Sequence, residues 1–219
     1  MSDQPPFDLS ETDRLLSTTR SVRRRLDLER PVDPAVVLEC VELAQQAPTG
    51  SNGQGWRWMV VTDAAKRAEI ARLYSEAGAA YLEAAAAATS SAEDPQTRRV
   101  YESAFALTKV LDRVPVHVIP CIQGRFDGAP NGVAASSYGS ILPAAWSFLL
   151  ALRSRGLGSV WTTLHLFKEQ EVAELLGIPA DVTQVALFPV AHTVGTDFRP
   201  AARPPAGTIT FWDSWGSAR

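Results

Sequence analysis

Cysteine is scarce in this chain, and there is no surplus of positive charge. The 219 residues include two cysteines, Cys40 and Cys121, too few for a disulfide framework and not spaced as metal ligands. We expect both to be reduced thiols in the core. Lysine and arginine total 21 against 24 aspartate and glutamate, which excludes the broad basic surface of a nucleic-acid-binding protein. Any anion site must therefore be local, built from a few placed arginines.

Long hydrophobic runs are also missing. Residues 141–152 form the longest run, but Pro143 and Ser147 interrupt it, and it is shorter than the roughly 20 residues that a membrane helix needs. The N-terminus is acidic and polar and lacks the basic and apolar regions of a signal peptide. The sequence therefore predicts a soluble, cytoplasmic protein that binds neither a membrane nor nucleic acid.

Several common enzyme motifs are absent too. The sequence has no glycine-rich dinucleotide fingerprint, no P-loop, no HExxH and no GxSxG. Acidic residues form no pair suited to acid–base work. We expect His117 and His192 to be structural, while His165 is a candidate for substrate contact. No side chain is predicted to be catalytic by itself and no metal site is predicted, so an enzyme of this composition would depend on a bound cofactor.

What is present predicts helices around a small sheet, an α+β fold. Capping residues and apolar residues at helical spacing predict helices over residues 11–18, 33–46, 63–74, 78–88, 96–111, 137–155 and 168–176. Runs rich in β-branched and aromatic residues predict strands over 56–62, 114–122, 160–164 and 182–191. No linker divides the chain. We expect an N-terminal arm with a short helix (residues 1–18) and one domain with its tail (residues 19–213).

Two stretches in the first quarter of the chain have compositions suited to binding. Residues 19–24 (TRSVRR) offer arginines and a serine hydroxyl to a phosphate or another anion, although a solvated basic turn has the same composition. Residues 47–56 (APTGSNGQGW) have small side chains that let a flat ligand approach the backbone. Asn52 and Gln54 can pair with the edge of a heterocycle. The alternative for this second stretch is an ordinary connection between a helix and a strand.

Two further stretches lie late in the chain. Residues 156–164 (GLGSVWTTL) carry two threonines that could present NH or hydroxyl groups to a ring nitrogen, although tryptophan and threonine also simply favour strands. Arg203, followed by Pro204, could complete an anion site begun by Arg20 and Ser21, or it could be a surface charge.

In this order, the four stretches resemble the nitroreductase family of flavin enzymes. The pattern is an early R-S-x-R, then A-P-(T/S)-x-x-N-x-Q-x-W leading into a strand, a later helix ending in G-L-G-S, and R-P near the C-terminus. The resemblance implies a sandwich in which helices flank a small mixed or antiparallel sheet. It also implies an intertwined homodimer with FMN at the subunit interface. The apolar helix 137–155 would then form much of the dimer core, and the tail would wrap the neighbour.

Carried over to this chain, the resemblance also implies the cofactor-binding residues. Those assigned to the phosphate and the pyrimidine side of FMN are Arg20, Ser21, Arg23 and, as an added candidate, Arg24. Those assigned to FMN from the partner chain are Pro48, Thr49, Gly50, Ser51 and Asn52. Thr162 and Thr163 would lie near flavin N5, and Arg203 would bind the phosphate.

The reaction implied is reduction of nitroaromatics, quinones or similar flat, electron-poor acceptors. NADH or NADPH would donate a hydride at flavin N5, and donor and acceptor would use one pocket in turn, in ping-pong order. Residues 77–111 would form part of an apolar wall for the acceptor. Two other functions stay open: a flavin-binding storage or sensing protein without turnover, and a flavin-dependent dehydrogenase or dehalogenase on the same scaffold.

Overall fold

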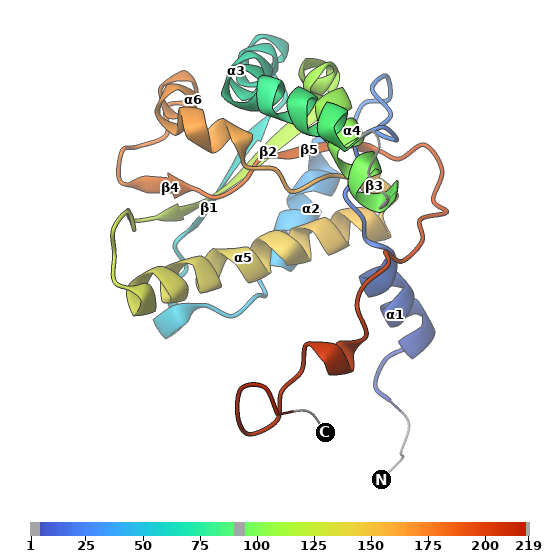
Figure 1. Cartoon of the computed structure of the whole chain (residues 1–219). Coiled ribbons are helices and arrows are strands. Elements are labelled where there is room, and N and C mark those ends of the chain that lie inside the picture. Colours follow the sequence, from blue (N-terminus) through green and yellow to red (C-terminus); the bar gives the residue numbers. More distant parts are fainter. Residues whose placement is uncertain (1–4, 90–94, 218–219) are drawn as a thin grey trace. The chain divides into compact units, whose positions relative to one another are not determined.

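An antiparallel sheet of five strands lies at the centre of residues 19–196 (Figure 1). The structure is a computed structural model that describes residues 5–89 and 95–217. The strands are β1 (Trp56–Val61), β2 (Val116–Gln123), β3 (Leu157–Gly158), β4 (Val182–Gln184) and β5 (Phe188–His192). Their order is β1–β2–β5–β3. Strand β5 pairs with the N-terminal half of β2, and β4 pairs with the C-terminal end of β2. The predicted α+β class with a small antiparallel sheet is confirmed.

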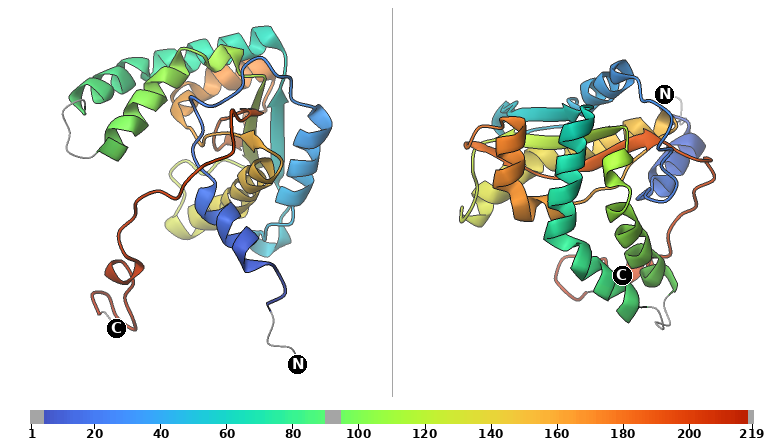
Figure 2. Two further views of the ribbon diagram at one scale, coloured as in Figure 1. Left: turned by 90° about the vertical axis from the view of Figure 1, so that its right-hand side faces the viewer. Right: turned by 90° about the horizontal axis from the view of Figure 1, so that it is seen from above.

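Helices cover both faces of this sheet. One face carries α3 (Ala64–Ala88), α4 (Pro95–Thr108) and α6 (Glu169–Leu176), and the other carries α2 (Pro34–Ala44) and α5 (Asn131–Ser154) (Figures 1 and 2). The core between the sheet and α5 centres on Phe148, whose ring lies 5.2 Å from that of Trp58 and 6.0 Å from that of Phe188. Burying such large rings is the main source of stability at this interface.

Helix ends follow local chemistry that the sequence already shows. Asp33 accepts the amide of Ala35 at 2.9 Å at the start of α2, and Asp63 accepts the amide of Lys66 at 2.8 Å at the start of α3. Gly177 ends α6 in the left-handed conformation, with φ of 69°. These starts and stops are confirmed as predicted.

Two helix predictions are wrong in extent. The structure has one continuous α3 where two helices were predicted over residues 63–74 and 78–88. Gly78 continues the helix because α3 lies directly on Leu164: a Cβ at Gly78 would stand 2.5 Å from Leu164 Cδ1. Helix α5 begins at Asn131, six residues before the predicted start, since the small residues after Pro130 continue the helix.

Two strand predictions also need correction. Residues 160–164 are not a strand: Thr162 makes a single bridge to Leu187, and Leu164 begins the 3-10 helix η3 (Leu164–Lys168). The predicted strand over 182–191 is divided into β4 and β5. The break occurs because Leu187 exchanges both backbone hydrogen bonds with Thr162 instead of β2.

The remaining described residues form a separate unit of the chain. It contains α1 (Leu9–Thr18), which confirms the predicted arm helix, and the tail from Asp197, which holds the 3-10 helix η4 (Ala206–Thr208). The rings of Phe211 and Trp215 lie 4.9 Å apart at the end of the tail.

Candidate functional site

The first and third binding stretches lie side by side. The amide of Val22 donates to the carbonyl of Ser159 at 2.8 Å. A Cβ at Gly158 would lie 2.5 Å from Thr193 Cγ2 and 3.2 Å from Val22 Cβ, so glycine is required where these segments meet. The predicted residues Arg20, Ser21, Arg23 and Arg24 are therefore held against the segment that leads to Thr162 and Thr163.

Arg23 is a half-buried cation that lacks a counter-charge. Its Nη1 donates to Ser103 Oγ of α4 at 3.2 Å. Within the described ranges, no carboxylate forms an ion pair with it. Burial lowers the pKa of Arg23, and the neighbouring phenol of Tyr74 partly offsets this. A guanidinium stays charged in proteins, so this position offers an unneutralised positive charge to an anionic group.

Tyr74 is the site residue that the sequence analysis missed. It faces inward from α3, is only 2% exposed, and its hydroxyl lies 2.7 Å from Thr162 Oγ1. Burial raises the pKa of Tyr74, while the bond to Thr162 and the charge of Arg23 lower it. The available signal was its place on the apolar stripe of a helix, since a buried phenol needs a polar partner. Tyr74 thus connects the arginine stretch to the threonine stretch.

The other predicted residues of these two stretches differ in exposure. Arg20 is half-buried, whereas Ser21 and Thr163 are exposed. Arg24 is exposed and lies 3.7 Å from Glu102. The buried Ser159 Oγ has no hydrogen-bond partner among the described residues. A buried hydroxyl without a partner is a group that a polar ligand or a water molecule can satisfy.

The second stretch, residues 48–52, is attached to α5 instead. The amide of Gly50 donates to Ser140 Oγ at 2.9 Å, and a Cβ at Gly50 would lie 2.6 Å from Ser136 Oγ. Ser51 and Asn52 have φ of 52° and 54°, a left-handed conformation that is unfavourable for residues other than glycine. Strain of this kind is concentrated at functional sites. Pro48 and Asn52 are exposed, and Thr49 is half-buried.

A single chain does not unite this loop with the other two stretches. No hydrogen bond found in residues 5–89 and 95–217 joins it to Arg23 or Thr162. The loop is bonded to Ser140 of α5, whereas the arginine stretch is bonded to Ser159, beyond the end of α5 at Ser154. Fourteen residues of α-helix span about 21 Å. The chain therefore carries two separated sets of predicted cofactor residues.

Arg203, the last predicted contact, lies in the tail, in the other unit of the chain. It is exposed, and its Nη1 donates to the carbonyl of Ala202 at 3.0 Å. Its assignment to the phosphate stays a prediction.

Two histidines and both cysteines lie in the core. His117 is buried and its Nε2 lies 2.9 Å from the carbonyl of Leu111, which confirms its structural role; burial lowers its pKa to about 4. His165 is also fully buried, which argues against the substrate contact for which it is a candidate. Cys40 and Cys121 are buried free thiols, as predicted, and burial raises the pKa of Cys121 to about 12.

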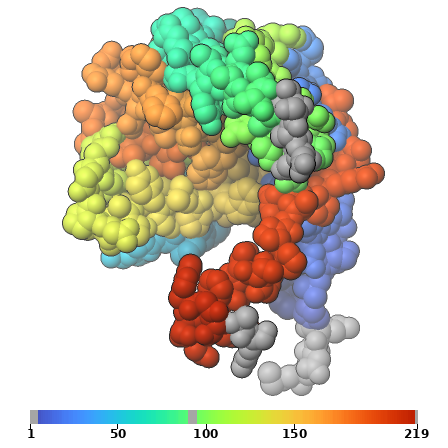
Figure 3. Space-filling model, viewed as in Figure 1, coloured from blue at the N-terminus to red at the C-terminus, as the bar shows by residue number. Residues whose placement is uncertain are grey.

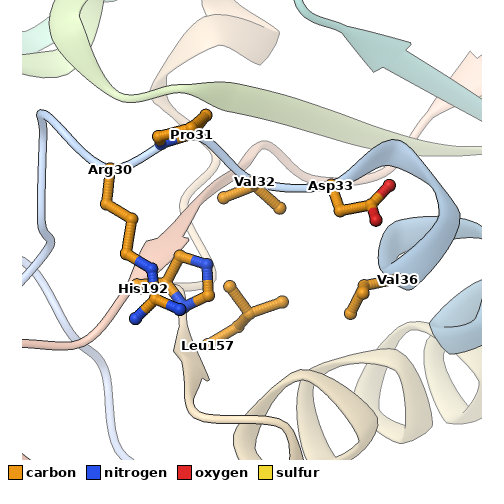
Figure 4. Close-up of a pocket in the computed structure, with 7 residues that line it drawn as sticks. All are labelled: Arg30, Pro31, Val32, Asp33, Val36, Leu157 and His192. Atoms are coloured by element: carbon orange, nitrogen blue, oxygen red, sulfur yellow. The ribbon is translucent and has the colours of Figure 1, made fainter.

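Two cavities in the described part of the chain lie away from these residues. One, of about 460 Å³, lies between α2 and β3 and is lined by Arg30, Pro31, Val32, Asp33, Val36, Leu157 and His192 (Figure 4). The other, of about 830 Å³, lies beside α6, and its lining residues include Arg125, Phe167 and Glu169. None of the predicted cofactor residues lines either cavity.

The chain is similar to known proteins over most of its length. A model of the nitroreductase family matches residues 16–195. The chain is 30% identical over 196 residues to the 5,6-dimethylbenzimidazole synthase of Rhodospirillum rubrum (85% of each chain covered). It is 29% identical over 209 residues to an NADH dehydrogenase of Thermus thermophilus (88% of this chain, 91% of that one). The crystal structure of iodotyrosine deiodinase bound to FMN and 3-iodo-L-tyrosine has a TM-score of 0.66 at 23% identity, over 88% of this chain and 94% of that one. With most of its length matched by the family model, the chain belongs to the nitroreductase family.

Proposed function

We propose that this chain is an FMN-dependent oxidoreductase that uses NADH or NADPH to reduce nitroaromatics, quinones or similar flat, electron-poor acceptors. Family membership supports an oxidoreductase, and two relatives are named as an NADH dehydrogenase and as a deiodinase with bound FMN. The observation that carries the proposal is Arg23, which has no ion-pair partner among the described residues and lies in the stretch that Val22 bonds to Ser159. An anionic edge of a flavin nucleotide would find a matching charge there.

The residues of the first and third stretches fit FMN. Arg20, Ser21 and Arg24 would hold the phosphate, and Arg23 would lie at the pyrimidine side. The threonines would lie at the edge of the ring that carries N5. The orphaned hydroxyl of Ser159 and the missing counter-charge of Arg23 are the two features that such a ligand would satisfy.

When bound, FMN supplies the hydride chemistry, and the chain supplies binding and electrostatics. The charge of Arg23 lies in a half-buried position, where Coulomb interactions are stronger than in water. It would therefore favour negative charge on the group bound against it.

An acceptor would meet aromatic side chains of α3 and α4. The rings of Tyr81 and Tyr101 pack edge to face with centroids 6.5 Å apart, and Lys109 lies 4.5 Å above the ring of Phe105. Aromatic faces of this kind suit a flat, electron-poor molecule. Acceptor selection is accordingly proposed to lie in this pair of helices, within the region 77–111.

A second copy of the chain would complete the site, as a homodimer. Helix α5 carries Leu142 (38% exposed) and Trp146 (43% exposed), and the adjacent α2 carries Leu38 (59% exposed). Figure 3 shows the yellow band of α5 lying open at the surface. By length and composition α5 could cross a membrane, with 33% of its most apolar 18-residue window buried, but the core helix of a soluble protein passes the same test. We propose that α5 and α2 of the partner cover this apolar surface.

Mixed dimers test whether the site is shared. In a dimer of one Asn52→Ala chain and one Arg23→Ala chain, a shared site predicts one intact FMN site, built from the unmodified Arg23 and Asn52 of different copies. The other site carries both changes. Flavin content after gel filtration should therefore be half that of wild type, and both homodimers should lose most of their flavin. If both sites of the mixed dimer lose flavin equally, the loop and the arginine of one copy belong to the same site, and the site is not shared between copies.

Arg203→Ala is expected to weaken FMN binding by about 1–3 kcal/mol, because one charge-assisted bond to the phosphate is lost. Titration of the apoprotein with FMN, followed by flavin fluorescence, measures the change. Binding of riboflavin, which has no phosphate, should stay the same in the variant. An unaltered FMN affinity would remove Arg203 from the site.

Turnover separates the proposal from its alternatives. The purified protein should be yellow, or become yellow with FMN, and should oxidise NADH or NADPH when a quinone or nitroarene is supplied. Flavin binding without such oxidation would instead indicate storage or sensing. To test the other alternative, the bound flavin would be photoreduced without oxygen and then offered a panel of acceptors that includes a halogenated phenol and an activated alkene. Reoxidation of the flavin by one of these acceptors would indicate a dehalogenase or a dehydrogenase.

A further inference from the structure

The two threonines of the third stretch differ in what their hydroxyls contact. Thr162 Oγ1 lies 2.7 Å from the buried hydroxyl of Tyr74. Thr163 is exposed at the start of η3, and no side-chain capping bond is made there. Only one of the two hydroxyls is therefore open to a ligand in this structure.

Tyr74 is held firmly where it meets Thr162. One turn further along α3, Gly78 packs so closely on Leu164 that no Cβ fits between them. On the other side, Thr162 exchanges backbone hydrogen bonds with Leu187, at 3.2 and 2.8 Å. Because both partners are fixed by their own backbones, the bond between Tyr74 and Thr162 joins two rigid elements.

The same phenol lies within electrostatic range of Arg23. Each group shifts the pKa of the other toward its charged form: the phenol raises the pKa of Arg23, and the guanidinium lowers that of Tyr74. In addition, Ser103 on α4 accepts from Arg23 at 3.2 Å. The guanidinium thus donates to a neutral hydroxyl of α4, and no carboxylate among the described residues forms an ion pair with it.

We propose that Tyr74 is a positioning residue that binds the Thr162 hydroxyl, which leaves Thr163 as the hydroxyl that faces the cofactor. The inference rests on the proposed function, since it concerns FMN. It divides two adjacent threonines into one that is held by Tyr74 and one that meets the ligand directly.

Tyr74→Phe tests the proposal because it removes only the hydroxyl. Without this bond to hold Thr162, the adjacent Thr163 hydroxyl should favour the reduced cofactor about tenfold less over the oxidised one, which lowers the two-electron midpoint potential of bound FMN by about 30 mV. Thr162→Val should lower the potential equally, and the double variant no further, because both changes break one bond. Thr162→Ser keeps the hydroxyl and should retain the wild-type potential. Tyr138→Phe, at a tyrosine of α5 whose ring packs against Phe126, is the matched control.

Each other outcome has a distinct meaning. If Tyr74→Phe lowers the melting temperature but leaves the potential unchanged, the bond is only structural and the proposal is overturned. Additive shifts in the double variant would also overturn it, because the residues would then act separately. Thr163→Val should change the absorption spectrum of bound FMN, and a spectrum identical to wild type would contradict the assignment of Thr163. If the wild-type protein takes up no FMN at all, it is the proposed function that fails.

Discussion

Arg23→Ala is expected to weaken FMN binding by roughly 2 kcal/mol, about thirtyfold in Kd. Arg23 is half-buried, its charge is not neutralised by a carboxylate within the described residues, and its hydrogen bond goes to the neutral hydroxyl of Ser103. Its interaction with an anionic ligand is therefore screened less by water than that of a surface arginine. Isothermal titration of the apoprotein with FMN measures the effect.

Arg72→Ala is a suitable control for this change. Arg72 is an exposed arginine on α3 whose guanidinium bonds to Glu69 and Glu76 on the same helix. Its removal should leave the Kd for FMN within a factor of two, since exposed ion pairs contribute little. If both variants bind FMN equally well, the arginine stretch is a solvated turn and the assignment of Arg23 is wrong.

Trp146→Glu is expected to have the largest effect on assembly, with conversion of the dimer to monomers that retain little FMN. Trp146 lies on the exposed apolar surface of α5, one turn from Leu142. A carboxylate there would be buried without a partner on both sides of the proposed interface, a cost of several kcal/mol for each copy. Sedimentation equilibrium and flavin content together measure the outcome.

A charged residue placed elsewhere should not dissociate the dimer. Phe167 is a more exposed apolar residue, 78% exposed, on η3 and outside α2 and α5. Phe167→Glu should therefore leave the protein dimeric. Circular dichroism of Trp146→Glu should show intact helices, because the side chain is already half open to solvent in the single chain. A folded Trp146→Glu protein that remains dimeric would place the interface on another surface.

Local sequence chemistry was sufficient to predict most element boundaries. The caps at Asp33 and Asp63 and the left-handed glycine at Gly177 depend on residues within one helical turn, so the sequence shows them directly. Predictions failed where distant segments decide. The sequence predicts a break in the helix before Gly78, whereas α3 continues through it and packs closely on Leu164.

The same distinction applies to the site. The arginine and threonine stretches were predicted from their residues and order, and the structure places them together through Val22 and Ser159. Tyr74 could not be found in this way, because its partner Thr162 is 88 residues away in the sequence. Helical periodicity predicts that a tyrosine faces inward but not which hydroxyl it meets.

The most direct test of the central claim is the stoichiometry of FMN uptake measured together with molecular mass. We would reconstitute the purified protein with excess FMN, remove unbound flavin, and determine flavin per chain by absorbance and mass by light scattering. The account predicts one FMN for each chain in a particle of twice the chain mass. A monomer that retains no flavin would contradict it.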